Sequence, residues 1–136
     1  MAGYSGTPLP KKLGIKAGFR VALPDVPPEV KAELRASLEQ CTNANGALDF
    51  ILLPAKSQAD LRKKFSQWSR RLSPTGMLWV SWPKKTSGVA TDLDENRVRE
   101  IGLAAGLVDV KVCAVSEVWS GLKFVIRVKN RPRAQD

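Results

Sequence analysis

Histidine is absent from this 136-residue chain. The absence excludes a Ser-His-Asp or Cys-His nucleophile, an HExxH zinc site and a histidine pH switch, because each of them needs an imidazole. Cysteine is almost absent as well, since Cys41 and Cys113 lie far apart and form no CxxC pair. Two thiols are too few for a structural zinc or an iron–sulfur cluster. We therefore expect two reduced thiols and no metal site.

Long hydrophobic runs and an export signal are also missing. The longest apolar stretches, such as residues 50–53, are far too short to cross a bilayer. The first six residues contain no basic region followed by an apolar segment. These features predict a soluble, cytoplasmic protein that does not bind a membrane.

Positive charge is what the chain has in excess. Its 22 Lys and Arg residues against 13 Asp and Glu residues leave a net charge of +9, while 43% hydrophobic and 26% charged residues are typical of one globular domain. A basic domain can bind nucleic acid or an acidic partner. The cations are spread over several short clusters without a recognition-helix, RRM or KH signature, so nucleic-acid binding is a secondary hypothesis.

We divide the chain into an irregular arm (residues 1–18), one α/β domain (residues 19–128) and a basic tail (residues 129–136). Strand and helix signals alternate within the domain, which is typical of a largely parallel sheet covered by helices. The first three strands are expected at residues 19–23, 48–53 and 77–82.

Helix starts and turns are predicted from capping and breaking residues. Prolines at 27 and 28 suit the first turn of a helix, Ser57 with Asp60 is a capping signal, and Asp92 with Glu95 has the same spacing. Residues 73–76 (SPTG) indicate a turn. Two alternating strands joined through Ser120-Gly121 complete the order β-α-β-α-β-α-β-β as an antiparallel hairpin.

The direction of strand addition has a consequence for the faces of the sheet. If the parallel strands are added in one direction, right-handed crossovers place all three helices on the same face. The helix-free face then needs a cover. Either the arm supplies it through Tyr4, Leu9, Leu13 and Ile15, or a second copy of the chain does so in a homodimer.

The turn and strand at residues 72–80 (LSPTGMLWV), followed by the final hairpin, resemble the second half of class I S-adenosylmethionine-dependent methyltransferases. This resemblance implies a truncated Rossmann-like, mixed sheet of about five strands, mostly parallel, with the last strand between the third and fourth. The whole chain is more specifically similar to a bacterial family of short proteins without assigned function (domain-of-unknown-function family 3052). That similarity implies no activity, and it is carried by residues 4–14, 78–85, 87–93, 106–115 and 119–122.

The resemblance to methyltransferases departs at the cofactor loop. Those enzymes place a glycine-rich turn after the first strand, where the backbone closely approaches the cofactor. Here residues 24–28 (PDVPP) follow the strand, and no glycine occurs between Gly18 and Gly46. Proline has no N–H and cannot adopt a positive φ. The sequence therefore disfavours S-adenosylmethionine, and no other cofactor is predicted.

Ligands of mostly parallel sheets bind beyond the carboxyl ends of the strands. The segment at residues 84–88 (KKTSG) combines two cations, two hydroxyls and a glycine, which can hold a phosphate or carboxylate. The alternative for this segment is a solvated loop. The predicted ligand-binding residues are Lys84, Lys85, Thr86, Ser87, Gly88, Trp119, Lys56, Asp25 and Glu117.

One tryptophan and two carboxylates have further candidate roles. Trp119, near the hairpin turn, is expected either to line a pocket or to cap the core. Asp25 and Glu117 are two carboxylates at strand ends, and such a pair can perform acid–base chemistry when the two pKa values differ. No catalytic residue is assigned.

The sequence favours a non-catalytic domain that binds an anionic ligand or a protein partner at the strand-end edge. One alternative is a divergent small transferase or methyltransferase that uses the same edge, with Asp25 or Glu117 as base. The other is a non-specific nucleic-acid binder whose affinity falls with salt.

Overall fold

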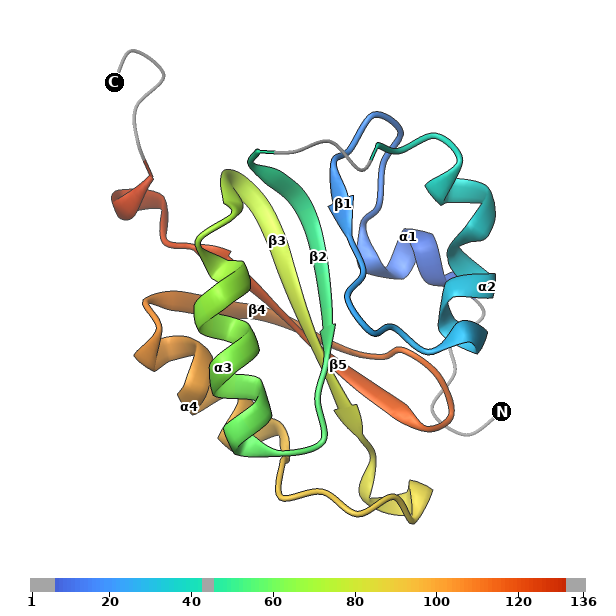
Figure 1. Ribbon diagram of the computed structural model, residues 1–136, viewed down its shortest axis with the longest axis vertical. Coiled ribbons are helices and arrows are strands. Elements are labelled where there is room, and N and C mark those ends of the chain that lie inside the picture. Colours follow the sequence, from blue (N-terminus) through green and yellow to red (C-terminus); the bar gives the residue numbers. More distant parts are fainter. Residues whose placement is uncertain (1–6, 43–45, 132–136) are drawn as a thin grey trace.

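In the computed structural model, which describes residues 7–42 and 46–131, one five-stranded sheet separates two pairs of helices (Figure 1). The strands are β1 (Val21–Ala22), β2 (Leu48–Pro54), β3 (Leu72–Pro83), β4 (Leu107–Ala114) and β5 (Trp119–Ile126). The helices are α1 (Leu9–Leu13), α2 (Pro28–Leu38), α3 (Gln58–Ser69) and α4 (Glu95–Ala104), with short 3-10 turns η1 (Lys85–Ser87) and η2 (Val128–Asn130).

The strand order is β1-β2-β3-β5-β4, so the last strand lies between the third and the fourth, as the resemblance implied. Strands β1, β2 and β3 are parallel, and β5 is antiparallel to both of its neighbours. Four strands therefore point the same way, yet half of the pairings are antiparallel. The expectation of a mixed sheet is confirmed, while its description as mostly parallel is only partly right.

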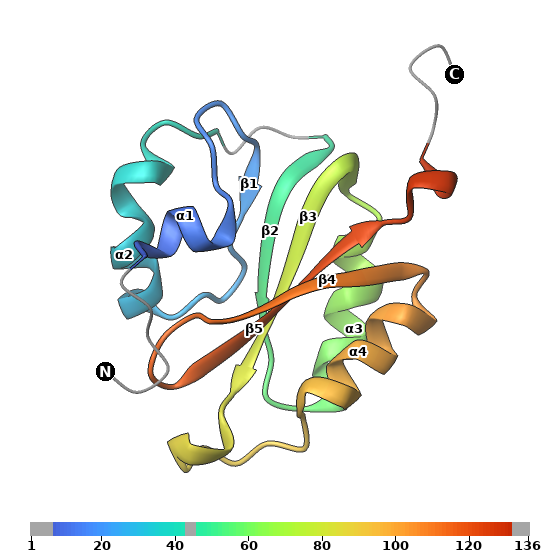
Figure 2. The same ribbon diagram turned by 180° about the vertical axis from the view of Figure 1, so that it is seen from behind.

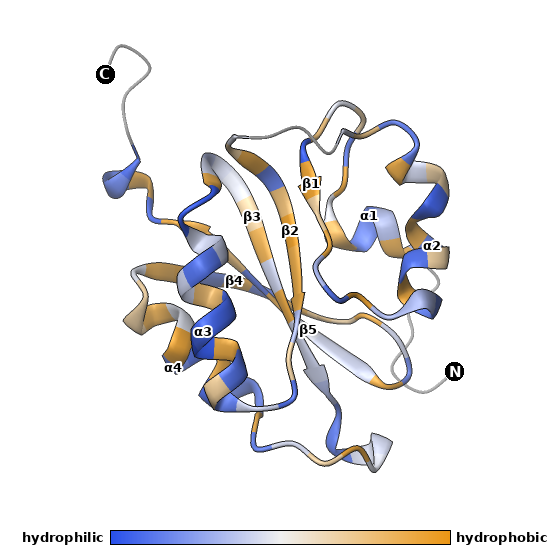
Figure 3. Ribbon diagram, viewed as in Figure 1, coloured by the Kyte–Doolittle hydropathy of each residue, from blue (hydrophilic) through white to orange (hydrophobic). Residues whose placement is uncertain are grey.

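The helices cover both faces of the sheet. Phe50 and Leu52 of β2 pack with α1 and α2, whereas the alternate residues Ile51 and Leu53 pack with α3 and α4. Both views show the two helix pairs on opposite sides (Figures 1 and 2). Hydrophobic residues run along most of β2, which is buried between the layers (Figure 3).

The prediction that all three helices share one face is therefore wrong. The crossovers through α2 and α3 advance in the same direction across the sheet, from β1 to β2 to β3, but they pass over opposite faces. The two crossovers must then have opposite hands, and the prediction assumed that both were right-handed. The premise of a helix-free face is wrong, because α1 and α2 pack on that face over β1, β2 and β3, while the homodimer itself stays a prediction.

The amino-terminal arm is not irregular throughout, because residues 9–13 form α1. Leu9 and Leu13 are buried against the sheet, and Ile15 packs beside them. The indole N–H of Trp79 donates a hydrogen bond of 2.9 Å to the Leu13 carbonyl oxygen and ties α1 to β3. The arm is thus one of the two covers that were predicted; Tyr4 lies outside the described residues.

The predicted turn at residues 73–76 is part of β3. Leu48 pairs with Leu72 and Phe50 pairs with Met77, so this segment bulges out of the β2–β3 ladder. A Cβ atom at Gly76 would lie 2.7 Å from the Leu48 carbonyl oxygen. Proline and glycine occur in β-bulges as well as in turns, so the sequence pattern alone does not distinguish a bulged strand from a turn.

Two further local predictions need correction. The side chain of Ser57 caps α3 as expected, but α4 is capped by Asp94, which accepts a 2.8 Å bond from the Arg97 amide, and not by Asp92. Ser120 and Gly121 belong to β5 instead of the hairpin turn. A side chain at Gly121 would be crowded, because a Cβ atom there would lie 2.8 Å from Val115 Cγ2 and 3.2 Å from the ring of Trp79.

A pH-dependent contribution to stability is expected from Asp109 of β4. Its carboxylate accepts a 2.9 Å hydrogen bond from Arg99 of α4, and this bond lowers the pKa of Asp109 below its usual value. The contribution is complete above the ordinary aspartate pKa of about 3.9 and is lost as the pH falls through the lower pKa of the folded state. Asp109→Asn should therefore have a lower thermal midpoint than the wild type at neutral pH. In strong acid, the two proteins should have the same thermal midpoint.

The matched control is Glu100→Gln. Glu100 pairs with Arg97 at a site where both side chains are more than half exposed, and such pairs contribute little. Thermal unfolding at several pH values measures both variants. A deficit of Asp109→Asn that persists unchanged in strong acid would contradict the ion-pair argument.

Candidate functional site

The carboxyl ends of β1 and β2 meet at a pocket, here called the β1/β2 crevice. After these strands the chain turns to opposite faces of the sheet, through α2 and α3, and ligands of open α/β sheets bind at such points. The pocket has a volume of about 350 Å³. It is lined by Asp25, Pro27, Pro54, Ala55, Lys56, Asp60, Lys64 and Trp119.

Lys64 of α3 is the central charge of the crevice. Its ammonium nitrogen donates a 2.8 Å hydrogen bond to the carbonyl oxygen of Pro54 and lies 3.0 Å from Asp60 Oδ2. Only 19% of the side chain is exposed. These contacts hold the end of β2 and the first turn of α3 together, so Lys64 is a positioning group on the wall of the crevice.

Asp25 and Lys56 carry the charges that remain available at the mouth. The Asp25 side chain is 78% exposed, and its carboxylate lies 3.8 Å from the Lys64 ammonium, which is a long ion pair. Lys56 is exposed and forms no ion pair with any residue in ranges 7–42 and 46–131. The crevice therefore offers one carboxylate and one ammonium group to a ligand.

Trp119 both packs in the core and lines a pocket, the two roles that the sequence leaves open. It is 7% exposed and packs with the core that lies under α1 and α2, and its accessible edge lines the crevice. Together with Pro27 and Pro54 it provides the apolar part of the wall. A flat, rigid apolar surface of this kind suits the hydrocarbon or ring portion of a small ligand.

The helix N-termini at this edge have few free backbone N–H groups that could donate hydrogen bonds to an anion. Helix α2 starts at Pro28, preceded by Pro27, and neither residue has an N–H. At the start of α3, the amide of Gln58 donates to the Asp92 carboxylate (2.8 Å) and the amide of Asp60 donates to the Ser57 hydroxyl (3.1 Å). The protein's own side chains thus occupy donors that bind phosphates in other α/β domains.

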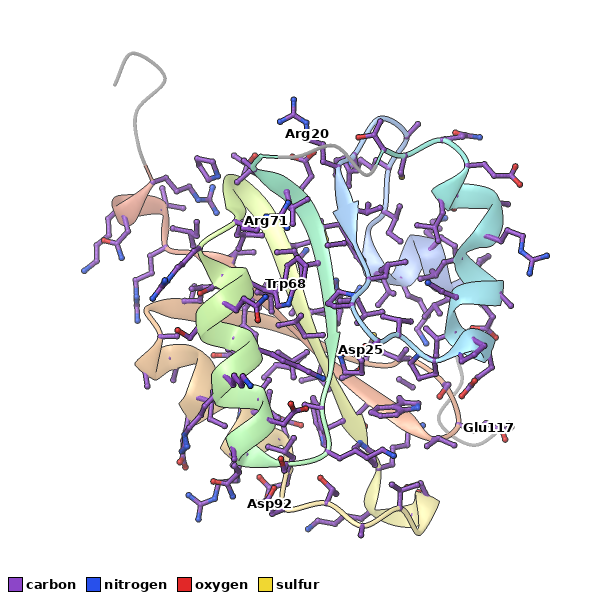
Figure 4. The ribbon with its side chains drawn as sticks, viewed as in Figure 1. Arg20, Asp25, Trp68, Arg71, Asp92 and Glu117 are labelled. Atoms are coloured by element: carbon purple, nitrogen blue, oxygen red, sulfur yellow. The ribbon has the colours of Figure 1, made fainter. Side chains whose placement is uncertain are left out.

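The other predicted ligand-binding residues lie elsewhere. Lys84, Thr86 and Glu117 line a separate, open groove beside the β4–β5 hairpin, together with Val112, Cys113, Ala114 and Ser120. Figure 4 shows Asp25 near the middle of the sheet edge, whereas Glu117 lies at the far end of the hairpin. The structure therefore does not bring Asp25 and Glu117 together as an acid–base pair.

Residues 85–88 form a tight turn in a loop, and a loop is the alternative that the sequence offers to an anion site. The hydroxyl of Ser87 donates to the Lys84 carbonyl oxygen (2.6 Å) and accepts from the Val89 amide (3.2 Å). Gly88 has a φ of 76°, a conformation that glycine adopts without strain. Lys85, Ser87 and Gly88 line neither the crevice nor the groove.

Sequence reasoning missed Asp60 and Lys64. Their i,i+4 spacing on α3 was visible, but it reads as an ordinary surface ion pair, which is what such spacing usually means. Both residues lie in the first two turns of a helix that directly follows a buried strand. That position is the signal that places them at the carboxyl edge of the sheet. Within the described ranges, no three Cys, Asp or Glu residues are grouped as metal ligands, and no helix is long and apolar enough to span a bilayer.

Comparison with known protein families identifies the chain. The family described as protein of unknown function (DUF3052) matches residues 11–128. The chain belongs to this family. A search by sequence among curated proteins finds no match. The fold of this DUF3052 protein is nevertheless shared with solved structures, a methyltransferase among them.

Three of these structures contain S-adenosylmethionine. Magnesium protoporphyrin IX methyltransferase (ChlM) from Synechocystis PCC 6803 with bound SAM matches with a TM-score of 0.56 at 12% identity, over 87% of this chain and 74% of that chain. Fibrillarin from Aeropyrum pernix with natively bound S-adenosyl-L-methionine matches with a TM-score of 0.55 at 11% identity, over 90% and 70%. The LepI complex with SAM matches with a TM-score of 0.53 at 12% identity, over 88% and 39%.

The DUF3052 chain spans only about two fifths of the length of TnmH (42%) and LepI (39%). At such identities the matches show a shared fold and no shared activity. They do not exclude S-adenosylmethionine, which the sequence disfavours, because structures with this fold contain it. The missing glycine loop remains a local difference of the DUF3052 chain.

Proposed function

We propose that this protein is a binding domain for a small zwitterionic ligand, one with an α-ammonium and a carboxylate, and that the β1/β2 crevice is its site. The observation that carries the proposal is the convergence of Asp25, Lys56 and Trp119 in one pocket at the ends of β1 and β2. Asp25 pairs with the ligand ammonium, Lys56 pairs with its carboxylate, and Trp119 contacts its apolar part.

The charge balance of the crevice favours a zwitterion over a simple anion. Two carboxylates, of Asp25 and Asp60, stand against two ammonium groups, of Lys56 and Lys64. Since Lys64 and Asp60 satisfy each other at 3.0 Å, one charge of each sign is left for a ligand. An anion alone would leave Asp25 as a repulsive neighbour, and two amides in the first turn of α3, those of Gln58 and Asp60, are already occupied.

S-adenosylmethionine and S-adenosylhomocysteine both carry an α-amino acid group, and they are therefore the first ligands to test. Neighbouring structures bind one or the other. That this chain binds either compound is part of the proposal. Methyl transfer is the second candidate function, and it is favoured by the same neighbours.

Isothermal titration calorimetry of the full chain with S-adenosylmethionine, S-adenosylhomocysteine, methionine and adenosine tests the proposal. We expect binding of at least one compound with the α-amino acid group, and binding of adenosine at least about tenfold weaker. Asp25→Asn and Lys56→Gln should each weaken binding by about tenfold, because each removes one charged partner at the mouth.

Glu117→Gln and Lys84→Gln are the matched controls, since these residues line the separate groove. Both variants should bind like the wild type. The proposal fails if none of the amino acid compounds binds, if adenosine binds equally well, or if Lys84→Gln weakens binding as much as Lys56→Gln. Conversion of bound S-adenosylmethionine to S-adenosylhomocysteine in the presence of an acceptor would instead establish the methyltransferase alternative.

A further inference from the structure

Three lysines converge on the part of the sheet that α1 and α2 leave open, on β4 and β5. Lys111 of β4 and Lys123 of β5 are directly paired across an antiparallel ladder, so their Cβ atoms lie about 4.5–5.5 Å apart on one face. Lys16, just after α1, is close enough to act electrostatically on Lys123. We call Lys16, Lys111 and Lys123 the lysine strip.

In the described part of the chain, no carboxylate is paired with this strip. Within residues 7–42 and 46–131, none of the three lysines forms an ion pair. Lys123 is half-buried, and burial together with Lys111 and Lys16 lowers its pKa below the usual lysine value. Like charges directly opposite each other destabilise a sheet, so the folded chain keeps them at a cost.

Protection of a sheet edge explains only part of this arrangement. Lys111 lies on the edge strand β4, where lysines and bulges discourage pairing with other chains. Lys123 lies on β5, which is paired on both sides by β3 and β4, and it therefore protects no edge. A second reason for the cluster is needed.

The surface around the strip limits the kind of partner. Lys16 and Lys111 are exposed, and neither Lys111 nor Lys123 lines the β1/β2 crevice or the groove beside the hairpin, so we treat the strip as an open surface. In the described part of the chain no aromatic side chain is fully exposed, and the partly exposed Trp68 packs against the core under α3 and α4, on the other face of the sheet. The register shift between Asp109 and Lys111 disturbs the free edge of β4, which disfavours addition of a peptide strand.

We propose that the lysine strip binds the phosphate backbone of a single-stranded nucleic acid without reading its sequence. Closely spaced ammonium groups on an open surface match closely spaced phosphates, and backbone contacts of this kind need neither a pocket nor stacking. The net charge of +9 supports the approach of such a polyanion. This binding is independent of the proposed role of the β1/β2 crevice.

Fluorescence anisotropy with a labelled single-stranded oligonucleotide of mixed sequence, measured on the full chain over a range of salt concentrations, tests the inference. The double variant Lys111→Gln, Lys123→Gln should bind at least about tenfold more weakly at low salt. The slope of log affinity against log salt should fall by about 1.4, because each lost contact to a single strand contributes about 0.7.

The control is Lys31→Gln with Lys63→Gln, which removes the same charge from exposed positions on α2 and α3. It should retain the wild-type slope. Thermal unfolding separates misfolding from lost binding, since the strip variant should be at least as stable as the wild type. The inference is overturned if the wild type does not bind at low salt, if both double variants lose affinity equally, or if polyglutamate competes as well as an unlabelled oligonucleotide.

Discussion

Trp79→Ala is expected to lower the free energy of unfolding by about 3–5 kcal/mol, the usual cost of truncating a large buried aromatic side chain. Trp79 is fully buried on β3 and is among the largest side chains of the core. It fills the space between the sheet and α1, and its ring lies 3.2 Å from the position that a Cβ atom would take at Gly121. The truncated side chain would leave a cavity that the neighbouring strands cannot close.

The indole of Trp79 has a second role, because its N–H bond to Leu13 fastens α1. Trp79→Phe keeps most of the ring and removes the donor, so it should cost about 1–3 kcal/mol for the unsatisfied carbonyl oxygen. Chemical denaturation measures both variants. Limited digestion with trypsin adds a local readout, since loosening of α1 exposes the chain at Lys11 and Lys12.

Trp68→Ala is the matched control for Trp79→Ala. Trp68 is only partly buried near the end of α3, where the Arg71 guanidinium lies 5.3 Å from the centre of its ring (Figure 4). The same substitution should therefore cost much less there, because less apolar area is lost. Equal losses at the two positions would contradict the assigned role of Trp79.

Gly102→Ala is expected to destabilise the protein, although alanine normally stabilises a helix by about 1 kcal/mol relative to glycine. A Cβ atom at Gly102 of α4 would lie 2.0 Å from Cε1 of Phe124. The ring of Phe124 is fully buried and is held edge-on against Phe65, with centroids 5.3 Å apart. Overpacking of such a site costs about 1–3 kcal/mol or more.

A double-mutant cycle makes the Gly102 prediction specific. Phe124→Leu removes the edge of the ring that meets the new methyl group, so Gly102→Ala should cost clearly less in that background. Leu103→Ala, at an exposed position of the same helix, controls for changes in α4 alone. If Gly102→Ala raises the thermal midpoint in the wild-type background, the close packing of α4 on β5 is not as described.

The order of the elements was predictable because its signals are local. Proline at the start of α2, the Ser57 cap of α3 and the alternating pattern of β4 and β5 all act within a few residues. The bulge in β3 was not predictable in the same way. Pro74 and Gly76 break regular structure, but only the pairing with β2 decides that a strand continues through them.

The candidate site was partly predictable. Asp25 and Lys56 follow strands directly, and residues at such positions come together at one edge of a sheet. Trp119 joins them through β5, whose pairing with β3 is a long-range contact. The Lys84 segment and Glu117 were placed at the same edge by the same rule, but the strands separate them into another groove.

The sequence by itself determined the succession of strands and helices after α1, the lack of histidine chemistry and the excess of positive charge. Only the tertiary structure decided that α2 and α3 lie on opposite faces, and hence that a crevice opens between the ends of β1 and β2. The physical reason is that periodicity shows which side of a helix is apolar but not against which face it packs. That choice depends on many weak contacts among residues distant in sequence, such as those of Leu13 and Trp79.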